Sequence, residues 1–178
     1  MVDHADIKRD LPDWPDDVID QWLFHLANRE DTGWPPPDPL GTHAWTYILG
    51  HRPVSWWREV TWKLETTDCS HEKLSLATQR IVNQMIAEVG RKIVEDATRR
   101  RFNNAFQDIL NTGGFPSPLI AMRMADGLSV IDGNHRVSAF CGVQLMRDER
   151  FQDLGKQRPA REHEIWIGTH SRGEVPLD

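Results

Sequence analysis

The sequence has few cysteines and no long apolar run, features that disulfide-rich, zinc-binding and membrane proteins require. Its two cysteines, Cys69 and Cys141, are too few for a disulfide framework or a four-thiolate zinc site. No apolar run approaches the roughly 18 residues that span a bilayer, and the first residues lack the basic and apolar regions of a secretory signal. We therefore expect a cytoplasmic protein that does not enter a membrane.

Positive charge is also in short supply. Of 178 residues, 21 are Lys or Arg and 27 are Asp or Glu, which gives a net charge of −6. A chain with this balance is not a general nucleic-acid binder, so any nucleic-acid contact has to be local. The length predicts one domain with at most an appended segment.

Signature motifs of several enzyme classes are missing from the sequence. It contains no Walker loop, no dinucleotide-binding fingerprint and no Gly-X-Ser-X-Gly elbow. His163, Glu164 and His170 do not have the spacing of an established zinc site, and no cysteine pair accompanies them. The sequence therefore does not indicate a Walker-type NTPase, a dinucleotide-dependent enzyme, a serine hydrolase or a zinc protein.

What is present is distributed unevenly along the chain. Seven of the eight tryptophans precede residue 68, and the first 70 residues carry 6 basic and 13 acidic side chains, against 15 and 14 in the remainder. We therefore expect an acidic helical segment rich in Trp and Pro over residues 1–68, followed by an α+β domain over residues 69–178. The tryptophans either pack this segment onto the second domain or form an exposed patch for a partner.

The first segment shows three short helical patterns. Asp13 is the expected N-cap of a helix that continues to about Leu26. Further helices are expected over residues 42–49 and 55–64. The prolines of residues 33–39 predict an extended connector, because they remove backbone donors and fix φ.

From Ser70 onwards the helical signal strengthens. Apolar residues recur with a period of 3.6 as far as Ala97, which predicts one long helix. A basic run from Arg91 to Arg101 lies in its second half. This run is either a solvated helix face or a local contact with nucleic acid.

After Pro118 the hydrophobic period changes from 3.6 to 2, which indicates strands. The elements expected around this change are a helix over residues 102–110 that ends at Gly113, a hairpin of strands near 120–124 and 128–131, a helix over 135–141 that ends at Gly142, and a last strand at 165–167.

One stretch at the end of the hairpin carries candidate chemistry. The second strand leads to Asp132, Gly133 permits a positive φ, and Asn134 is a preferred N-cap. A helix N-terminus presents unpaired N–H groups, and Arg136 adds a permanent cation, so the segment predicts a phosphate site. Asp132 is a candidate Mg²⁺ ligand or general base, and His135 is a candidate donor to phosphate. The alternative interpretation is ordinary turn chemistry with solvated side chains.

The strand, turn and helix around Ile-Asp-Gly-Asn-His-Arg, residues 131–136, resemble the core of the ParB/sulfiredoxin-like superfamily. The resemblance covers about residues 100–168, and the Asp-Gly-X-His-Arg form is nearest to its kinase-like branch. It implies a small mixed sheet with helices that binds ATP, ADP or CTP with Mg²⁺. The implied activity is transfer of a phosphate to an unknown acceptor, or hydrolysis of the nucleotide.

The same resemblance implies a role for each residue of the motif. Asp132 and His135 would act in catalysis, and Asp132 would hold the metal. The residues implied in phosphate binding are Gly133, Asn134, His135 and Arg136, completed by Arg123 of the adjacent strand.

Two departures from the superfamily narrow this prediction. Asn134 stands where sulfiredoxin has its reactive cysteine, so reduction of sulfinic acids is not expected, and Cys141 is expected to be a small buried hydrophobe. Too few residues follow Arg136 for the DNA-reading helices of a partition protein. The competing hypotheses are a non-catalytic module that contacts DNA through Arg91–Arg101 and an interaction factor that works through its Trp-rich segment.

Overall fold

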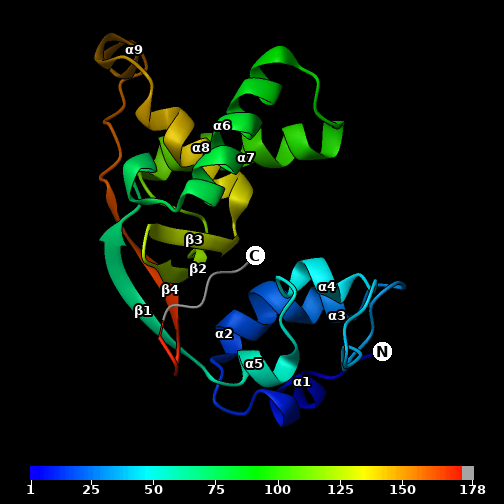
Figure 1. The fold of residues 1–178 in the computed structure, drawn as a ribbon. Helices are drawn as coiled ribbons and strands as arrows, with labels where there is room; N and C mark the ends of the chain where they lie inside the picture. Colours follow the sequence, from blue (N-terminus) through cyan, green and yellow to red (C-terminus); the bar gives the residue numbers. More distant parts are fainter. Residues whose placement is uncertain (174–178) are drawn as a thin grey trace. The chain divides into compact units, whose positions relative to one another are not determined.

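The computed structural model describes residues 1–173 and has the α+β architecture that the sequence predicts (Figure 1). Its four-stranded sheet has the order β1-β4-β2-β3. The strands are β1 (Val60–Asp68), β2 (Ile120–Met124), β3 (Gly127–Asp132) and β4 (Glu162–His170).

The chain divides into two compact units. The first unit is Met1–Lys63 with the chain from Gly168 onwards, and the second is Leu64–Ile167. The sequence predicts one boundary near residue 68, whereas the two divisions in the structure fall within β1 and near the end of β4.

The first unit is built of short helices. Its elements are α1 (His4–Asp10), α2 (Asp16–Val18), the π-helical turn η1 (Ile19–Phe24), α3 (His25–Ala27), α4 (Trp45–Ile48) and α5 (Val54–Trp57). The prediction of Asp13 as an N-cap is wrong, because Pro15 holds that position and its carbonyl accepts from Val18 and Ile19.

The predicted helix over residues 55–64 is also wrong in its second half. From Val60 the chain is a strand in which Val60 and Trp62 are buried while Thr61 and Lys63 are exposed. This period of two suits a pleated strand and overrides the helical spacing of the apolar residues.

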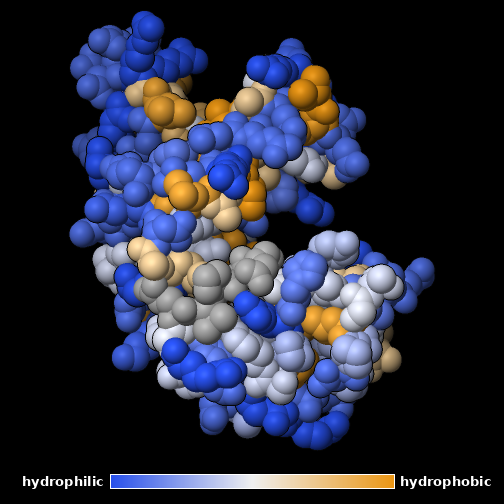
Figure 2. Space-filling model, in the orientation of Figure 1, coloured by the Kyte–Doolittle hydropathy of each residue, from blue (hydrophilic) through white to orange (hydrophobic). Residues whose placement is uncertain are grey.

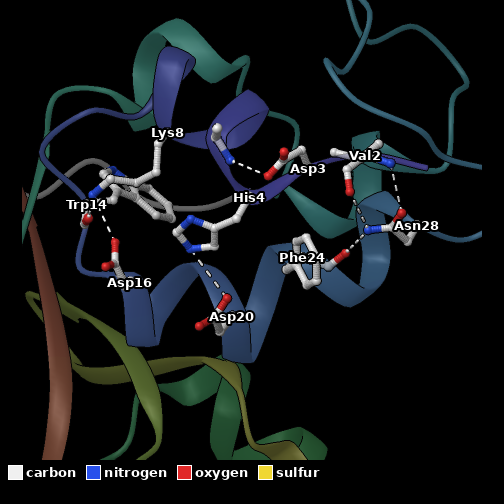
Figure 3. Close-up of polar contacts among 10 residues, drawn as sticks. Val2, Asp3, His4, Lys8, Trp14, Asp16, Asp20, Phe24 and Asn28 are labelled. Atoms are coloured by element: carbon white, nitrogen blue, oxygen red, sulfur yellow. Dashed lines mark hydrogen bonds and ion pairs between the residues drawn. The ribbon is translucent and has the colours of Figure 1, made fainter.

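Polar contacts fix α1 to its neighbours in the first unit (Figure 3). Asp3 closes a capping box at its start. The His4 Nε2 lies 3.4 Å from an Asp20 carboxylate oxygen. Lys8 donates to the Trp14 carbonyl at 2.6 Å and pairs with Asp16 at 3.2 Å.

Tryptophan rings form the core of the first unit. The Trp14 ring lies 5.1 Å from that of Trp62 and 5.7 Å from that of Trp22, and its Nε1 donates to the Trp57 carbonyl at 3.1 Å. Six of the unit's seven tryptophans are buried, namely Trp14, Trp22, Trp45, Trp56, Trp57 and Trp62. These rings are therefore core residues, and the predicted alternative of an exposed aromatic patch does not describe them.

In the second unit the long predicted helix is two helices, α6 (Leu76–Arg91) and α7 (Asp96–Thr112). Lys92 ends α6 in the left-handed region at φ 59°, and its N–H donates to the Val89 carbonyl at 3.1 Å. Ile93 is 66% exposed, so it does not continue the buried stripe. The turn η2 (His71–Lys73) precedes α6.

The hairpin is confirmed, with β2 and β3 antiparallel and Ile120 opposite Asp132. The predicted end of α7 at Gly113 is confirmed as well, since Gly113 is its C-cap at φ 79°. Gly142 does not end the next helix, α8 (Asn134–Gln144). A Cβ on Gly142 would lie 3.5 Å from Phe102, so this glycine allows close packing of α7 and α8.

The core of the second unit gathers around α8, with α7 packed along it. Val137, Ala139 and Phe140 of α8 are fully buried, as are Ile109 of α7 and Ile165 of β4. The short helix α9 (Asp148–Asp153) follows α8. Hydrophilic residues make up most of the surface in view, with scattered hydrophobic patches (Figure 2). Within residues 1–173, no helix has the length and apolarity that crossing a membrane requires.

Candidate functional site

The turn between β3 and α8 depends on glycine at position 133. Gly133 has φ 101° and is the N-cap of α8, so the sequence prediction of Asn134 as the N-cap is wrong. A Cβ at this position would lie 2.6 Å from Leu119 Cδ2 and 2.9 Å from Arg136 Nη2. Any residue other than glycine at this position would therefore be strained, both by the backbone conformation and by the close approach of these side chains.

The guanidinium of Arg136 joins the two ends of this turn. Its Nη2 lies 2.6 Å from Asp132 Oδ2, and its Nη1 donates to the Ser117 carbonyl at 3.0 Å and also to the Ser117 hydroxyl. Burial lowers the pKa of Arg136, and the Asp132 carboxylate opposes that shift. Because the side chain is only 13% exposed, Arg136 holds Asp132 and the loop before β2 in place.

The N-terminus of α8 carries no side-chain cap among the described residues. Its first helical hydrogen bond runs from the Val137 N–H to the Gly133 carbonyl at 2.9 Å. The N–H groups of Asn134, His135 and Arg136 precede that bond and lie at the positive end of an 11-residue helix. A group of this kind favours an anion.

His135 has an electrostatic neighbour that sequence reasoning did not assign to the site. Burial lowers the pKa of His135, the positive charge of Arg101 lowers it further, and Asp132 opposes the shift. The imidazole is therefore neutral at pH 7, and Arg101 of α7 adds positive charge beside α8. In the sequence, the only indication that Arg101 lies near the core is that it directly precedes Phe102, a buried residue of α7.

Two polar atoms of α8 are buried without a hydrogen-bond partner among the described residues, Asn134 Oδ1 and Ser138 Oγ. Their spacing of four residues puts them on one helix face. Ser138 is fully buried, and the sequence offers no nucleophile elbow around its hydroxyl. Unsatisfied buried polar atoms are uncommon in folded proteins and mark this end of α8 as unusual.

Arg123 does not lie beside Asp132 and Arg136, contrary to the prediction that it completes the phosphate site. It stands opposite Leu128 in the hairpin, whereas Asp132 stands opposite Ile120. Three residues along a strand span about 10 Å. The Arg123 guanidinium instead pairs with Glu65 at 3.0 Å.

Few other groups offer metal or thiol chemistry. Over residues 1–173, no cluster of three or more His, Cys, Asp and Glu side chains is arranged to hold a metal ion. Burial raises the pKa of both Cys69 and Cys141 to about 12, so both thiols stay protonated. Cys141 is buried, in agreement with its prediction as a small core residue.

The residues of the basic run are divided between the end of α6 and the first half of α7. Arg99 is paired with Asp96, and Arg101 lies near His135. The remaining members Arg91, Lys92 and Arg100 are exposed.

Comparison of the chain with protein-family models, with curated proteins and with solved structures found no match. The geometry of the α8 N-terminus is therefore the basis for a functional proposal.

Proposed function

We propose that this protein binds the phosphates of a nucleotide at the N-terminus of α8 and transfers or hydrolyses the terminal phosphate with Mg²⁺. The proposal includes a ParB/sulfiredoxin-like fold for the second unit, based on the motif at residues 132–136. The observation that carries it is the uncapped first turn of α8, which follows Gly133 at φ 101°.

Three features support phosphate as the ligand. The N–H groups of the first turn are directed along the helix axis toward the turn, and the helix dipole favours negative charge there. Gly133, at φ 101°, lets the chain turn from β3 directly into the first turn of α8. Arg101 adds positive charge near His135, and Asp132, which is paired with Arg136, supplies one carboxylate.

The residues present fit a magnesium ion that is held mainly by its nucleotide. Mg²⁺ in phosphoryl-transfer sites is usually bound by one or two carboxylates together with phosphates and water. Asp132, fixed by Arg136 at 2.6 Å, is such a carboxylate. When bound, the ion would offset the negative charge on the phosphates.

In the proposed reaction, a hydroxyl of the acceptor or a water molecule attacks the terminal phosphorus. The new O–P bond forms as the bond to the leaving nucleotide oxygen breaks, and Asp132 accepts the proton of the attacking group. The neutral His135 donates a hydrogen bond to a phosphate oxygen. The amides of the first turn of α8 orient the phosphate.

A thermal-shift screen with ATP, ADP, CTP and GTP, each with and without Mg²⁺, tests the proposal. A ligand at 100 times its Kd adds about 2.7 kcal/mol of stability, which gives a clear rise in Tm. The informative variant is Asn134→Asp, which places a negative charge in the first turn of α8, where it repels a bound phosphate.

The matched control is Asn103→Asp at an exposed position of α7. At least one nucleotide should raise the Tm of the wild type and of Asn103→Asp, and none should raise that of Asn134→Asp. The nucleoside without phosphates should have no effect. Equal shifts in both variants would place the binding site elsewhere, and no shift with any nucleotide would overturn the proposal.

A further inference from the structure

A cavity of about 530 Å³ lies in the second unit at the opposite end of α8. Its walls come from η2, from α6, from the last turn of α8 and from the chain before β4. The volume is within the range of small-molecule sites. Since 11 helical residues extend about 16 Å, this cavity is separate from the proposed phosphate site.

One of the two arginines at the cavity is already fully engaged. Arg158 donates to the carbonyls of Gln144 at 2.5 Å and Met146 at 2.6 Å. It also pairs with Asp148 at 2.7 Å. Its charge therefore stabilises the C-terminal end of α8, and it is not available to a ligand.

The other arginine has a partner that is easily replaced. Arg161 is 65% exposed and pairs with Glu72, itself 60% exposed, at 3.0 Å. Exposed ion pairs contribute little to stability because water solvates both partners. An anionic group can therefore take the place of Glu72, whose carboxylate returns to water.

A second polar group stands on the α6 wall. Asn83 lies in the cavity lining, and its Oδ1 is 2.9 Å from His71 Nε2. This contact directs the amide oxygen to the histidine and leaves the amide NH₂ as a donor for a ligand oxygen.

The rest of the lining includes an apolar surface. Ile86 is half-buried, and Leu145 is 73% exposed at the end of α8. Burial raises the pKa of the Cys141 thiol to about 12, so Cys141 itself adds no negative charge to the cavity. A hydrocarbon chain placed against these side chains would remove apolar surface from water.

We propose that this cavity binds a small amphiphilic monocarboxylate, independently of the proposed nucleotide site. The carboxylate pairs with Arg161 and accepts from the Asn83 amide, and the hydrocarbon chain lies against Ile86 and Leu145. A single negative charge matches the single available guanidinium. A doubly charged phosphate is disfavoured because Asp68 also interacts with the charge of Arg161, and Glu72 remains in the cavity lining after it gives up the pair.

Calorimetric titration with octanoate, kept below the concentration at which it forms micelles, tests the proposal. Butanoate and inorganic phosphate are the comparison ligands. The variants are Arg161→Gln, Leu145→Ser and, as the matched control, Arg100→Gln at an exposed position of α7 outside the cavity. All three positions are exposed, so the variants are expected to fold.

The wild type and Arg100→Gln should bind octanoate saturably and about 200-fold more tightly than butanoate, because four more methylenes are buried. Arg161→Gln should weaken octanoate binding about tenfold. Leu145→Ser should reduce the preference for octanoate over butanoate. Equal affinity of Arg161→Gln and the wild type, or absence of saturable binding, would overturn the proposal, and displacement of octanoate by phosphate would assign the cavity to phosphate ligands.

Discussion

Arg136 holds the turn between β3 and α8 in place through contacts with two separate segments. Its guanidinium contacts Asp132 and Ser117 while only 13% exposed. The spacing of Asp132 and Arg136, four residues apart, is readable from the sequence. The contacts with Ser117 and the proximity of Arg101 to His135 are not, since both depend on how separate segments pack.

Removing the carboxylate partner of Arg136 should destabilise the protein. Asp132→Asn leaves a largely buried cation without its counter-charge, which we expect to cost about 2 kcal/mol of unfolding free energy. Urea denaturation measures this loss. Glu65→Gln, which breaks the exposed pair with Arg123, should cost less than about 1 kcal/mol. Equal effects of the two substitutions would mean that the Asp132–Arg136 pair is solvated.

The depressed pKa of His135 predicts a loss of stability in mild acid. Below the ordinary histidine pKa of about 6.5 the unfolded chain binds a proton that the folded protein does not, so stability falls as the pH decreases through this range. His163, whose pKa burial also lowers, contributes in the same direction. His135→Gln should therefore lose less unfolding free energy than the wild type between pH 7.5 and 5.5.

The control for this comparison is Asn103→Gln at an exposed position of α7, which removes no titratable group and should lose as much as the wild type. A change in His135→Gln equal to that of the wild type would show that this histidine titrates alike in both states.

Arg101 should act on His135 through its charge. Arg101→Gln removes a cation that lowers the pKa of His135, so the imidazole should titrate at a higher pH in this variant. Proton NMR of the imidazole follows the titration directly. Arg100→Gln, on the same exposed stretch of α7, serves as the control and should leave the His135 titration in place. If the pKa of His135 is the same in Arg101→Gln as in the wild type, the charge of Arg101 does not act on the site.

At the scale of helices and strands, local sequence patterns predict the elements well, whereas features that depend on tertiary packing are not predicted. The hairpin and the end of α7 at Gly113 follow from period-two patterning and a glycine cap, and both are present. The break between α6 and α7 has no comparable signal, because a lysine, Lys92, adopts the left-handed conformation there. Gly142 resembles a helix stop in the sequence but serves the packing of α8 against Phe102.

Glycine substitutions test the turn that begins α8. Gly133→Ala forces a Cβ within 2.6 Å of Leu119 and within 2.9 Å of Arg136 at φ 101°, so we expect a loss of about 2 kcal/mol or more. Gly90→Ala in α6 meets nothing within 4 Å and should stabilise by up to about 1 kcal/mol. Chemical denaturation of both variants checks the sign. A stabilising Gly133→Ala would contradict the geometry of the turn.

At the scale of the whole molecule, the two units have cores of different composition. Indole rings dominate the first unit, whereas aliphatic side chains and phenylalanines dominate the second. The uneven tryptophan distribution indicates the first core from the sequence alone. The return of the chain from Gly168 to the first unit could not be predicted, because it depends on contacts between residues more than 100 positions apart, such as that of Ser171 with Glu59.

The tryptophan core should be sensitive to truncation. Trp14 is 1% exposed and its Nε1 donates to the Trp57 carbonyl, so Trp14→Ala should cost about 3–5 kcal/mol. Far-ultraviolet circular dichroism in urea measures the loss without depending on tryptophan emission. Trp34→Ala, at a half-buried ring, should cost clearly less. Similar costs would show that the rings are not a packed core.

The central claim, that the N-terminus of α8 binds nucleotide phosphates, is tested most directly by backbone amide NMR. The protein is titrated with the nucleotide and Mg²⁺ that give the largest thermal shift. The amides of Asn134, His135 and Arg136 should show the largest chemical-shift changes, and Asn134→Asp should abolish them. Shifts centred on other elements, with these three amides unchanged, would contradict the claim.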